Sequence, residues 1–304
     1  MSLATVNIRR FAYWLAVVDE GSFTRAARVL QIAQPSLSQQ VRALEAEVGG
    51  ALIGRLPGAV RLTPAGKAFL PEARAAVLAA ERAVRGARAA LKIESGELEI
   101  ATVRSIAVGL LPPSIRIWHD AYPGVTVRLH EYAHRDLLTE AVRSGVGDIA
   151  IGPRPRKWSG PLVSLGFEEF LLVLPASDPL AAKKAVPIAS LRDHRWVLFP
   201  PEHGLSELID SLCGRAGYVP REAVRTSQVE AAARLAAAGI GPALVPDNMV
   251  PADLDAAVRP VDPPVVRELV AYTRTEWSPS ARRYRDVVHA LPWRKPPRGA
   301  LTIN

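Results

Sequence analysis

The sequence predicts an α/β protein of two or three domains whose N-terminal part is helical apart from a small hairpin. Three observations support this fold class. The 304 residues exceed the length of one small module, and 49% of them are hydrophobic, which is enough for sizeable cores. Two short amphipathic helices and a long alanine-rich helix are expected before Gly96. Beyond Gly96, strand and helix patterns alternate along the chain.

Charge and cysteine content narrow the class of protein. The formal net charge is +8, from 38 Lys and Arg against 30 Asp and Glu, which suits a polyanionic partner and also a membrane surface. A single cysteine, Cys213, excludes an internal disulfide framework and is expected in the core of a protein from a reducing compartment. The sequence shows neither a signal peptide nor an apolar run near the ~20 residues of a membrane span. We therefore expect a soluble cytoplasmic protein without a membrane partner.

The segment from Glu20 to Val48 predicts two short helices joined by a tight turn. Ser22 is a suitable N-cap for the first helix, which should end near Leu30. The second helix should begin near Pro35, because a first-turn proline loses no intrahelical hydrogen bond. An earlier helix, over residues 8–18, should pack on both. The apolar positions of the second helix recur every three or four residues, at Leu37, Val41, Leu44 and Val48.

The polar face of this second helix has the side chains that read DNA in the major groove. Gln bonds adenine and Arg bonds guanine through two hydrogen bonds, while Ser reaches bases or phosphates. The alternative is an ordinary amphipathic helix with a solvated face, which the preceding helix, the short turn and the basic flank make less favourable. The candidates for DNA contact are Ser22, Thr24, Gln34, Pro35, Ser36, Ser38, Gln39, Arg42, Arg55 and Arg61.

A short hairpin should follow the second helix. We expect one strand over Ala51–Ile53, a loop containing Pro57 and Gly58, and a return strand over Val60–Leu62. Arg55 and Arg61 would then reach phosphates or the minor groove, contacts that position a protein without reading base sequence. The alternative is that both are solvated surface arginines.

A long helix is predicted from Thr63, its N-cap, to about Leu91. Its apolar stripe begins at Phe69 and cannot be buried by the helix itself, so we expect an antiparallel homodimer through this element. Pro71 should kink the helix, and residues 94–96 should form a hinge after it.

Several motifs in this region occur together in a fixed order. They are Phe11–Trp14, Gly21–Ala27, Gln34–Val41, Leu44–Glu45 and Arg61–Gly66. In these motifs the chain resembles the LysR-type transcriptional regulators. The resemblance implies a winged helix-turn-helix domain over residues 6–63, a linker and dimerisation helix over 64–95, and an effector domain over 96–304 with a periplasmic-binding-protein-like fold. It also implies double-stranded DNA and a small-molecule effector as partners, RNA polymerase as a further one, and a homodimer or homotetramer.

Four positions depart from the family's pattern. Ala33 stands where a capping Ser is usual, which would cost the helix ~1 kcal/mol unless Gln34 or a water supplies the cap. Gln39 stands where Arg or Lys is common. Ile53–Gly54 replaces Phe–Glu, and the loop over residues 56–59 is poor in arginine. These departures concern individual contacts within the module.

The effector domain should consist of two lobes, lobe I over about 96–168 and 272–292 and lobe II over about 169–271. Blocks that resemble the family's effector domain are Leu111–Pro112, Ala121–Pro123, Gly147–Ile151 and Ala238–Pro246. We expect right-handed βαβ units around a largely parallel sheet, with Val265–Tyr272 crossing back to lobe I. The tail after Pro292 should be disordered or extended.

Two such lobes form a cleft at the carboxyl ends of their strands, where ligands bind. The residues at those ends carry cationic groups, hydroxyl groups and one aromatic ring. We therefore expect the ligand to be a small carboxylate, either aliphatic or aromatic. Each residue has the alternative of being a helix cap or a surface side chain. The candidates are Thr102, Arg104, Ser105, His134, Arg154, Phe199, Pro200, His203, Thr226 and Ser227. The family resemblance places effectors at four of these, namely Ser105, His134, Phe199 and Ser227.

The sequence predicts no catalytic residue, no metal ligand and no cofactor. The six histidines do not recur at metal-ligand spacing, and no nucleophile elbow, P-loop or dinucleotide-binding motif follows a predicted strand. Two alternatives to an effector-controlled regulator are an architectural DNA-binding protein without a ligand and an α/β enzyme. A passive DNA binder would have no need of the two-lobed portion.

Overall fold

The computed structural model describes residues 7–56, 59–90 and 96–303. The chain forms two compact units, one of Met1–Gly96 with Arg143–Val146 and one of Glu97–Val142 with Gly147–Asn304. We call them the N-terminal and C-terminal units and describe each by itself. No helix among the described residues is long and apolar enough to cross a membrane.

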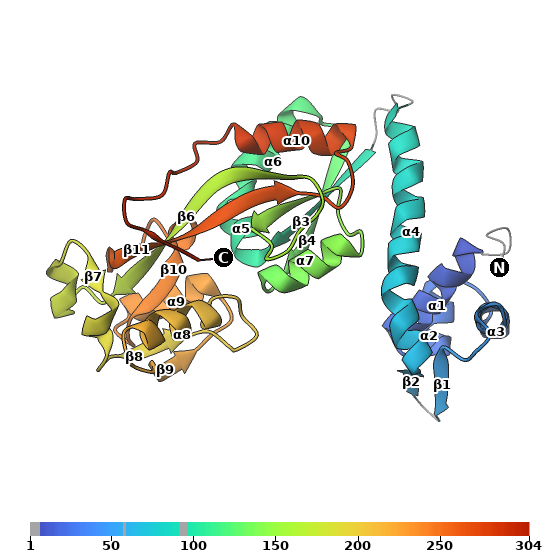
Figure 1. Ribbon diagram of the computed structural model, residues 1–304, viewed down its shortest axis with the longest axis horizontal. Helices are drawn as coiled ribbons and strands as arrows, with labels where there is room; N and C mark the ends of the chain where they lie inside the picture. The colour runs from blue at the N-terminus through green and yellow to red at the C-terminus, as the bar shows by residue number, and fades with distance from the viewer. Residues whose placement is uncertain (1–6, 57–58, 91–95, 304) are drawn as a thin grey trace. The chain divides into compact units, whose positions relative to one another are not determined.

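The N-terminal unit begins with three helices, α1 (Ile8–Glu20), α2 (Phe23–Val29) and α3 (Gln34–Val48). The Ser22 side chain accepts a hydrogen bond from the Arg25 N–H (3.4 Å), so the predicted N-cap of α2 is confirmed. Gly21 ends α1 in the left-handed conformation, which glycine adopts without steric cost. Both helices predicted between residues 20 and 48 are therefore present, as Figure 1 shows.

The core of this unit forms where the three helices meet. Trp14, Leu37, Val41 and Leu44 are buried, as the helical spacing of the last three predicts. Val48, the fourth predicted position of this stripe, is exposed at the last residue of the helix. Phe69 packs edge-on against Phe11 and Trp14, with ring centroids 5.0 and 5.2 Å apart. Trp14 and Phe69 therefore join the first helix to the fourth.

The hairpin consists of β1 (Ile53–Leu56) and β2 (Ala59–Leu62), which pair antiparallel. The prediction of a first strand over Ala51–Ile53 is wrong, because the strand begins only at Ile53. The reason is Glu45 of α3, whose carboxylate accepts hydrogen bonds from the N–H groups of Leu52 (2.8 Å) and Ile53 (3.0 Å). These hydrogen bonds fix the backbone at Leu52 and Ile53 against α3, so the pairing of the two strands starts only at Ile53. The predicted loop residues Pro57 and Gly58 lie outside the described residues.

The fourth helix, α4 (Pro64–Ala90), is the predicted long helix. Thr63 caps it by accepting a hydrogen bond from the Gly66 N–H (3.0 Å). The helix continues through Pro71, and the kink expected there stays a prediction. Its second half leaves apolar side chains uncovered, and Val84 is 52% exposed. Residues 94 and 95 of the predicted hinge lie outside the described residues, and Gly96 begins the next strand.

The C-terminal unit has two lobes. Lobe I contains the strands β3 (Gly96–Val103), β4 (Val125–Tyr132) and β5 (Ile149–Pro153), and the helices α5 (Arg104–Gly109), α6 (Leu111–Ala121), α7 (Arg135–Arg143) and α10 (Pro279–His289). α5 and α6 are separate helices, because Pro112 and Pro113 suit the first turn of a new helix.

Lobe II contains shorter elements. They are β7 (Val186–Pro187), β8 (Arg195–Leu198), β9 (Arg221–Arg225) and β10 (Ala243–Pro246), the helices α8 (Ser206–Arg215) and α9 (Val229–Ala237), and the 3-10 turns η2 (Pro179–Ala182), η3 (Ile188–Leu191) and η4 (Asp247–Met249). Cys213 is fully buried in the core of this lobe, as expected.

Two long strands connect the lobes, β6 (Leu162–Leu174) and β11 (Ala257–Tyr272). They pair antiparallel with each other over most of their length, and Figure 1 shows them side by side between the lobes. The predicted crossing of Val265–Tyr272 is confirmed, since Leu269–Tyr272 pair with β5 of lobe I. The expected largely parallel sheet is wrong: the order is β10-β6-β11-β5-β3-β4, and β11 runs antiparallel to both β6 and β5. β6 and β11 run in opposite directions from one lobe to the other. They therefore pair antiparallel with each other and with the neighbouring strands β10 and β5.

The tail after Pro292 ends in a strand. β12 (Leu301–Ile303) pairs parallel with Val265–Arg267 of β11. Of the two expectations for this tail, the extended conformation is the one observed among its described residues, 293–303. The apolar residues Leu301 and Ile303 pack against the core of lobe II, which gives the strand an apolar surface to bind.

Candidate functional site

The outer face of α3 is polar and open. Gln34, Pro35, Ser36, Gln39 and Arg42 are exposed, and Ser38 is half-buried. None of these five exposed residues forms a side-chain hydrogen bond or ion pair with the other described residues. The buried stripe on the opposite side fixes the helix to the core, so this face remains free to contact a partner.

The first turn of α3 has no side-chain cap. Ala33 occupies the N-cap position, and no side chain bonds the free N–H groups of the first turn. Helix N-termini attract anions because these N–H groups and the helix dipole both face outward. The departure from a capping Ser thus leaves this end of the 15-residue helix open to a phosphate or water.

Arg10 of α1 orients the inner edge of α3. Its Nε donates to Gln40 Oε1 (3.2 Å), and its guanidinium forms an ion pair with Glu47. Gln40 is consequently held inside the unit, whereas its neighbour Gln39 is free. Periodicity could not reveal this division, because the partner lies 30 residues away in the chain.

The other predicted DNA contacts lie on α2 and the hairpin. The Ser22 oxygen accepts from the Arg25 N–H, which leaves its hydroxyl proton to donate elsewhere. Thr24 is exposed on the first turn of α2, and Arg61 is exposed on β2. Arg55 lies opposite Val60 in the ladder, but its side chain falls outside the described side chains.

The C-terminal unit has two adjoining cavities between its lobes. Their volumes are about 400 and 240 Å³, within or near the range of about 300–1,000 Å³ in which proteins bind small molecules. Five residues line both cavities, namely His134, Arg135, His203, Gly204 and Arg267. We call the two cavities together the cleft.

Half of the predicted ligand contacts line the cleft. They are Arg104, Ser105, His134, His203 and Ser227. They come from the segments that follow strands of the two lobes, where the topology predicts a binding site. α5, which begins with Arg104, has only six residues.

The other five predicted contacts, Thr102, Arg154, Phe199, Pro200 and Thr226, do not line the cleft. They form contacts with other residues of the C-terminal unit instead. Thr102 Oγ1 donates to Ile151 O (2.8 Å), and Thr226 Oγ1 accepts from Gln228 N (3.3 Å). Arg154 bonds Glu268 of β11 (Nη2 to Oε1, 3.0 Å). The Pro200 carbonyl accepts from the His203 N–H (2.8 Å), and the buried Phe199 ring stacks on the His203 ring at 4.6 Å. Phe199 and Pro200 thus position a lining residue.

The two cleft histidines are held in one tautomer. The Leu137 N–H donates to His134 Nδ1 (3.4 Å), and the Leu205 N–H donates to His203 Nδ1 (3.2 Å). A nitrogen that accepts carries no proton, so in the neutral rings the proton is on Nε2. Burial lowers the pKa of His203 to about 4, and the charges of Arg104, Arg267 and His134 add to this effect. His203 therefore offers a neutral N–H donor at ordinary pH.

Arg267 lines both cavities and was not among the predicted contacts. Its side chain is 12% exposed and forms an ion pair with Glu168, which is 1% exposed. The guanidinium also lies 5.3 Å from the centre of the Phe170 ring, and Asn248 Nδ2 donates to Glu168 (3.2 Å). The sequence contains one indication of this role: two charged residues, Arg267 and Glu268, lie within an otherwise apolar stretch of a predicted strand. Burying a charge there without a partner costs free energy, so a functional or paired charge is expected.

Comparison with known proteins identifies both units. Residues 8–67 match the family described as "Bacterial regulatory helix-turn-helix protein, lysR family", and residues 92–292 match "LysR substrate binding domain". The chain belongs to the LysR family of transcriptional regulators. This agrees with the resemblance found in the N-terminal motifs, and it confirms the predicted fold class of a helix-turn-helix domain followed by a two-lobed α/β substrate-binding domain.

Relatives of this LysR-type regulator are similar over most of their length. The HTH-type transcriptional regulator AlsR of Bacillus subtilis is 28% identical, with 92% of this chain and 94% of AlsR covered. The regulator BudR of Raoultella terrigena is 33% identical, with 80% and 86% covered. Among solved structures, the LysR family regulator CbnR is 27% identical in sequence and superposes with a TM-score of 0.68, with 93% of this chain and 98% of CbnR covered. The structure of full-length CbnR in complex with its target DNA is also known.

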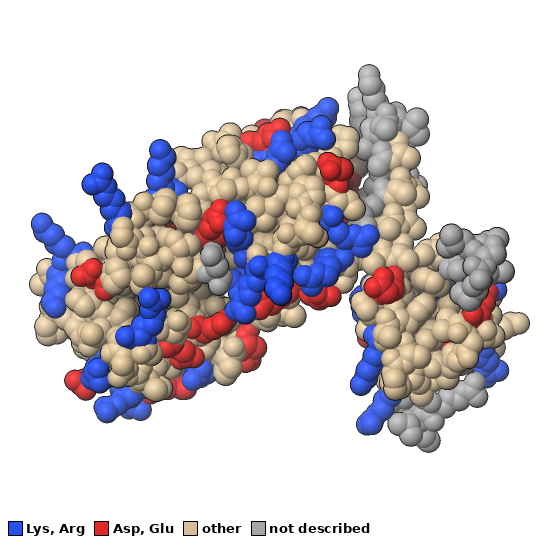
Figure 2. Space-filling model, viewed as in Figure 1, with Lys and Arg blue, Asp and Glu red and all other residues tan. Residues whose placement is uncertain are grey.

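The LysR-type regulator is thus a DNA-binding transcriptional regulator with an effector-binding domain. In the C-terminal unit, Figure 2 shows Lys and Arg side chains gathered on the middle of the face in view, with Asp and Glu beside them. Neighbouring charges of opposite sign match the many ion pairs of this unit, so the face in view offers no uniform field to a ligand.

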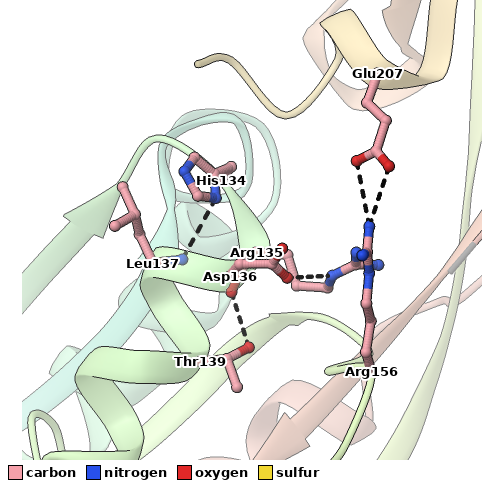
Figure 3. Close-up of polar contacts among 7 residues, drawn as sticks. All are labelled: His134, Arg135, Asp136, Leu137, Thr139, Arg156 and Glu207. Carbon is pink, nitrogen blue, oxygen red and sulfur yellow. Dashed lines mark hydrogen bonds and ion pairs between the residues drawn. The ribbon is translucent and has the colours of Figure 1, made fainter. Parts of the chain in front are cut away.

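One ion pair of the LysR-type regulator bridges the lobes beside the larger cavity, which Glu207 lines. Arg156 of lobe I bonds both carboxylate oxygens of Glu207 in α8 (3.1 and 3.3 Å), as Figure 3 shows. Beside it, Arg135 bonds Asp136 (3.1 Å). Burial opposes ionisation of Asp136, but Arg135, with Arg156 and His134, lowers its pKa overall. These charges fix the edge of lobe I that faces lobe II.

Within the described residues, no group of three or more His, Cys, Asp or Glu side chains is arranged to hold a metal ion.

Proposed function

We propose that α3 of this regulator reads operator DNA in the major groove, and that a small carboxylate bound in the cleft controls this binding. The observation that supports the first half is the free polar face of α3, with its open N-terminus. The second half is supported by a cleft that two imidazoles and an arginine from different segments line together.

The residues of the DNA-binding surface divide into two roles. Gln39 and Arg42 have the side chains that pair with bases, and each such pair contributes about 1–3 kcal/mol of discrimination. Arg61 of the hairpin and the open first turn of α3 would contact phosphates, as would the hydroxyls of Ser22 and Thr24. Arg55, Gln34, Pro35, Ser36 and Ser38 complete the proposed surface.

The proposed carboxylate would lie where the two cavities meet. His134 and His203 provide Nε2–H donors there, and Arg104 forms no ion pair or hydrogen bond with the other described residues. Hydrogen bonds to a charged acceptor are roughly twice as strong as neutral ones. Among the acidic lining residues, Asp136, Glu207 and Glu230 are each bonded to an arginine. Glu131 and Glu202 are exposed to solvent, which screens their repulsion.

No Phe, Tyr or Trp side chain is among the described residues that line the cleft. The part of the ligand away from the carboxylate would instead meet aliphatic side chains of the larger cavity, Pro153 and Leu208 among them. This lining fits an aliphatic acid better than an aromatic one that needs a stacking partner.

We further propose a homodimer or homotetramer formed through α4, whose apolar side chains, such as Val84, stay uncovered in a single chain. The domains would run over residues 6–63, 64–95 and 96–304, with lobe II over about 169–271. Closure of the lobes on the ligand would change the spacing of paired DNA-binding domains, a rigid-body switch. The operator would be an interrupted palindrome, and RNA polymerase a further partner.

A role in transcription also indicates where the protein acts in the cell and whether it is an enzyme. We propose that it acts in the cytoplasm, where bacterial DNA lies, and that it binds its ligand without catalysis. An architectural DNA binder without a ligand is the second candidate, and the cleft, lined by histidine and arginine side chains, is the observation that favours the regulator.

Two measurements test the proposal. Electrophoretic mobility shift with the DNA upstream of the coding region should show binding at moderate salt, and footprinting should protect a site with dyad symmetry. Failure to retard this DNA and neighbouring promoters would refute the DNA half. Calorimetry with a series of carboxylates should show binding that the Arg104→Ala variant loses. Absence of heat with every acid would refute the ligand half and favour the architectural candidate.

A further inference from the structure

The cleft has one wall that comes from the segment beyond the matched substrate-binding domain, which ends at residue 292. This segment returns to the cleft as β12, and Ile303 lines the larger cavity. We propose that β12 is the size-selecting wall of the cleft, and that Ile303 sets the length of the aliphatic part of a bound carboxylate. This inference rests on the proposed carboxylate site and assigns a specificity residue to it.

The segment is fixed along its course. The Trp293 Nε1–H donates to Val288 O (2.8 Å), and the Phe167 N–H of β6 donates to Arg294 O (3.3 Å). Arg294 also forms an ion pair with Asp247 of η4 (3.1 Å). The segment is thus tied to α10, to a crossing strand and to lobe II before it reaches the cleft, so the position of β12 is determined by packing.

The sheet has a place for β12 between the lobes. One edge of β11 pairs with β6, and its other edge pairs with β7 at Val261–Asp262 and with β5 at Leu269–Tyr272. Between these two partners, β12 pairs with Val265–Arg267. Since β7 belongs to lobe II and β5 to lobe I, β12 occupies the edge where the lobes meet.

The register puts Ile303 beside the charged part of the site. Ile303 is the direct partner of Arg267, and both side chains line the larger cavity. Ile303 belongs to the aliphatic part of the lining, with Pro153, Pro201 and Leu208. The polar part contains His134, His203 and Arg267, together with Arg135, Asp136, Glu202, Glu207 and Ser211. A ligand with its carboxylate near the histidines would therefore extend its chain toward Ile303.

The neighbouring residue provides a matched control. Successive side chains of a strand point to opposite faces, and Thr302 is exposed and lines neither cavity. Thr302→Ala changes the residue next to Ile303 in the same strand without altering the lining of the cleft. Ile303→Ala and Ile303→Phe lengthen and shorten the cavity, respectively.

The test measures the dissociation constants of straight-chain carboxylates from acetate to octanoate by calorimetry. The unaltered protein and Thr302→Ala should share one preferred length. Ile303→Ala should prefer a longer acid and bind the original one roughly tenfold more weakly, the loss expected for a few missing methylene contacts. Ile303→Phe should prefer a shorter acid. Circular dichroism melting curves confirm that each variant is folded.

Two results would overturn the inference, and they differ. If all four proteins prefer the same acid with equal affinity, the carboxylate site stands and Ile303 is not its wall. If the unaltered protein binds none of the acids, the proposed carboxylate site itself fails, and the role of Ile303 fails with it.

Discussion

Gly204 of lobe II lies directly against His134 of lobe I. A Cβ atom added at Gly204 would lie 3.2 Å from His134 Cβ and 3.5 Å from His134 Cα. Gly204 does not have a positive φ, so its backbone conformation suits any residue, and the close approach is what requires glycine. The two lobes meet at this contact beside both cavities, and a Cβ atom at position 204 would require His134 to give way by a few tenths of an ångström.

We expect the Gly204→Ala variant to bind carboxylates about three- to tenfold more weakly, because His134 has to give way by a few tenths of an ångström before the donors can converge on the ligand. Calorimetry measures the affinity, and small-angle scattering of the ligand-bound protein measures the closure. Gly214→Ala is the control, since an added Cβ there meets nothing within 4 Å. Equal affinities of the two variants would show that the contact does not govern closure.

The sequence predicted the N-terminal unit well because its signals are local. Ser22 and Thr63 cap helices that begin at the next residue, and the spacing of Leu37, Val41 and Leu44 directly encodes a buried face. The first strand of the hairpin was misplaced because its start depends on a carboxylate from the preceding helix, a contact that no local pattern shows.

The cleft could be predicted only in part. The rule that ligands bind at the carboxyl ends of strands found Arg104, Ser105 and His134. It also selected Thr102 and Arg154, whose polar groups are taken by Ile151 and Glu268. Arg267 and Ile303 were missed because they come from the middle of a crossing strand and from an added strand, where pairing between distant segments decides what lines the cavity.

The DNA-binding roles predict different salt and sequence dependence. Gln39→Ala should relax the preference for base sequence, because it removes a base contact. Arg61→Ala should weaken binding to all sequences alike and reduce the slope of log K against log salt concentration by about 1, because it removes one phosphate contact. Competition binding with single-base operator variants at several salt concentrations measures both effects. If both variants lose selectivity equally, the division of roles is wrong.

Glu45 should stabilise the N-terminal unit through the two N–H groups that it accepts. Glu45→Ala leaves both N–H groups without their partner, and we expect a loss of about 1–3 kcal/mol in the free energy of unfolding. Glu45→Gln keeps an amide oxygen as acceptor and should lose less. Urea denaturation followed by tryptophan fluorescence measures the difference. An unfolding curve of Glu45→Ala equal to that of the unaltered protein would contradict this role.

His203 should make the C-terminal unit less stable in acid. Its pKa is lowered from the ordinary value of 6.5 to about 4 in the folded protein, so between these values the unfolded chain binds a proton that the folded protein does not. The free energy of unfolding therefore falls as the pH drops from 6.5 to 4, by up to about 3 kcal/mol at 1.36 kcal/mol per pKa unit. His203→Gln should remove this part of the pH dependence, whereas His119→Gln, at an exposed position, should retain it. Denaturation curves measured between pH 7 and pH 4 test this, and parallel pH profiles for the His203→Gln variant and the unaltered protein would show that His203 is protonated as readily in the folded state as in the unfolded chain.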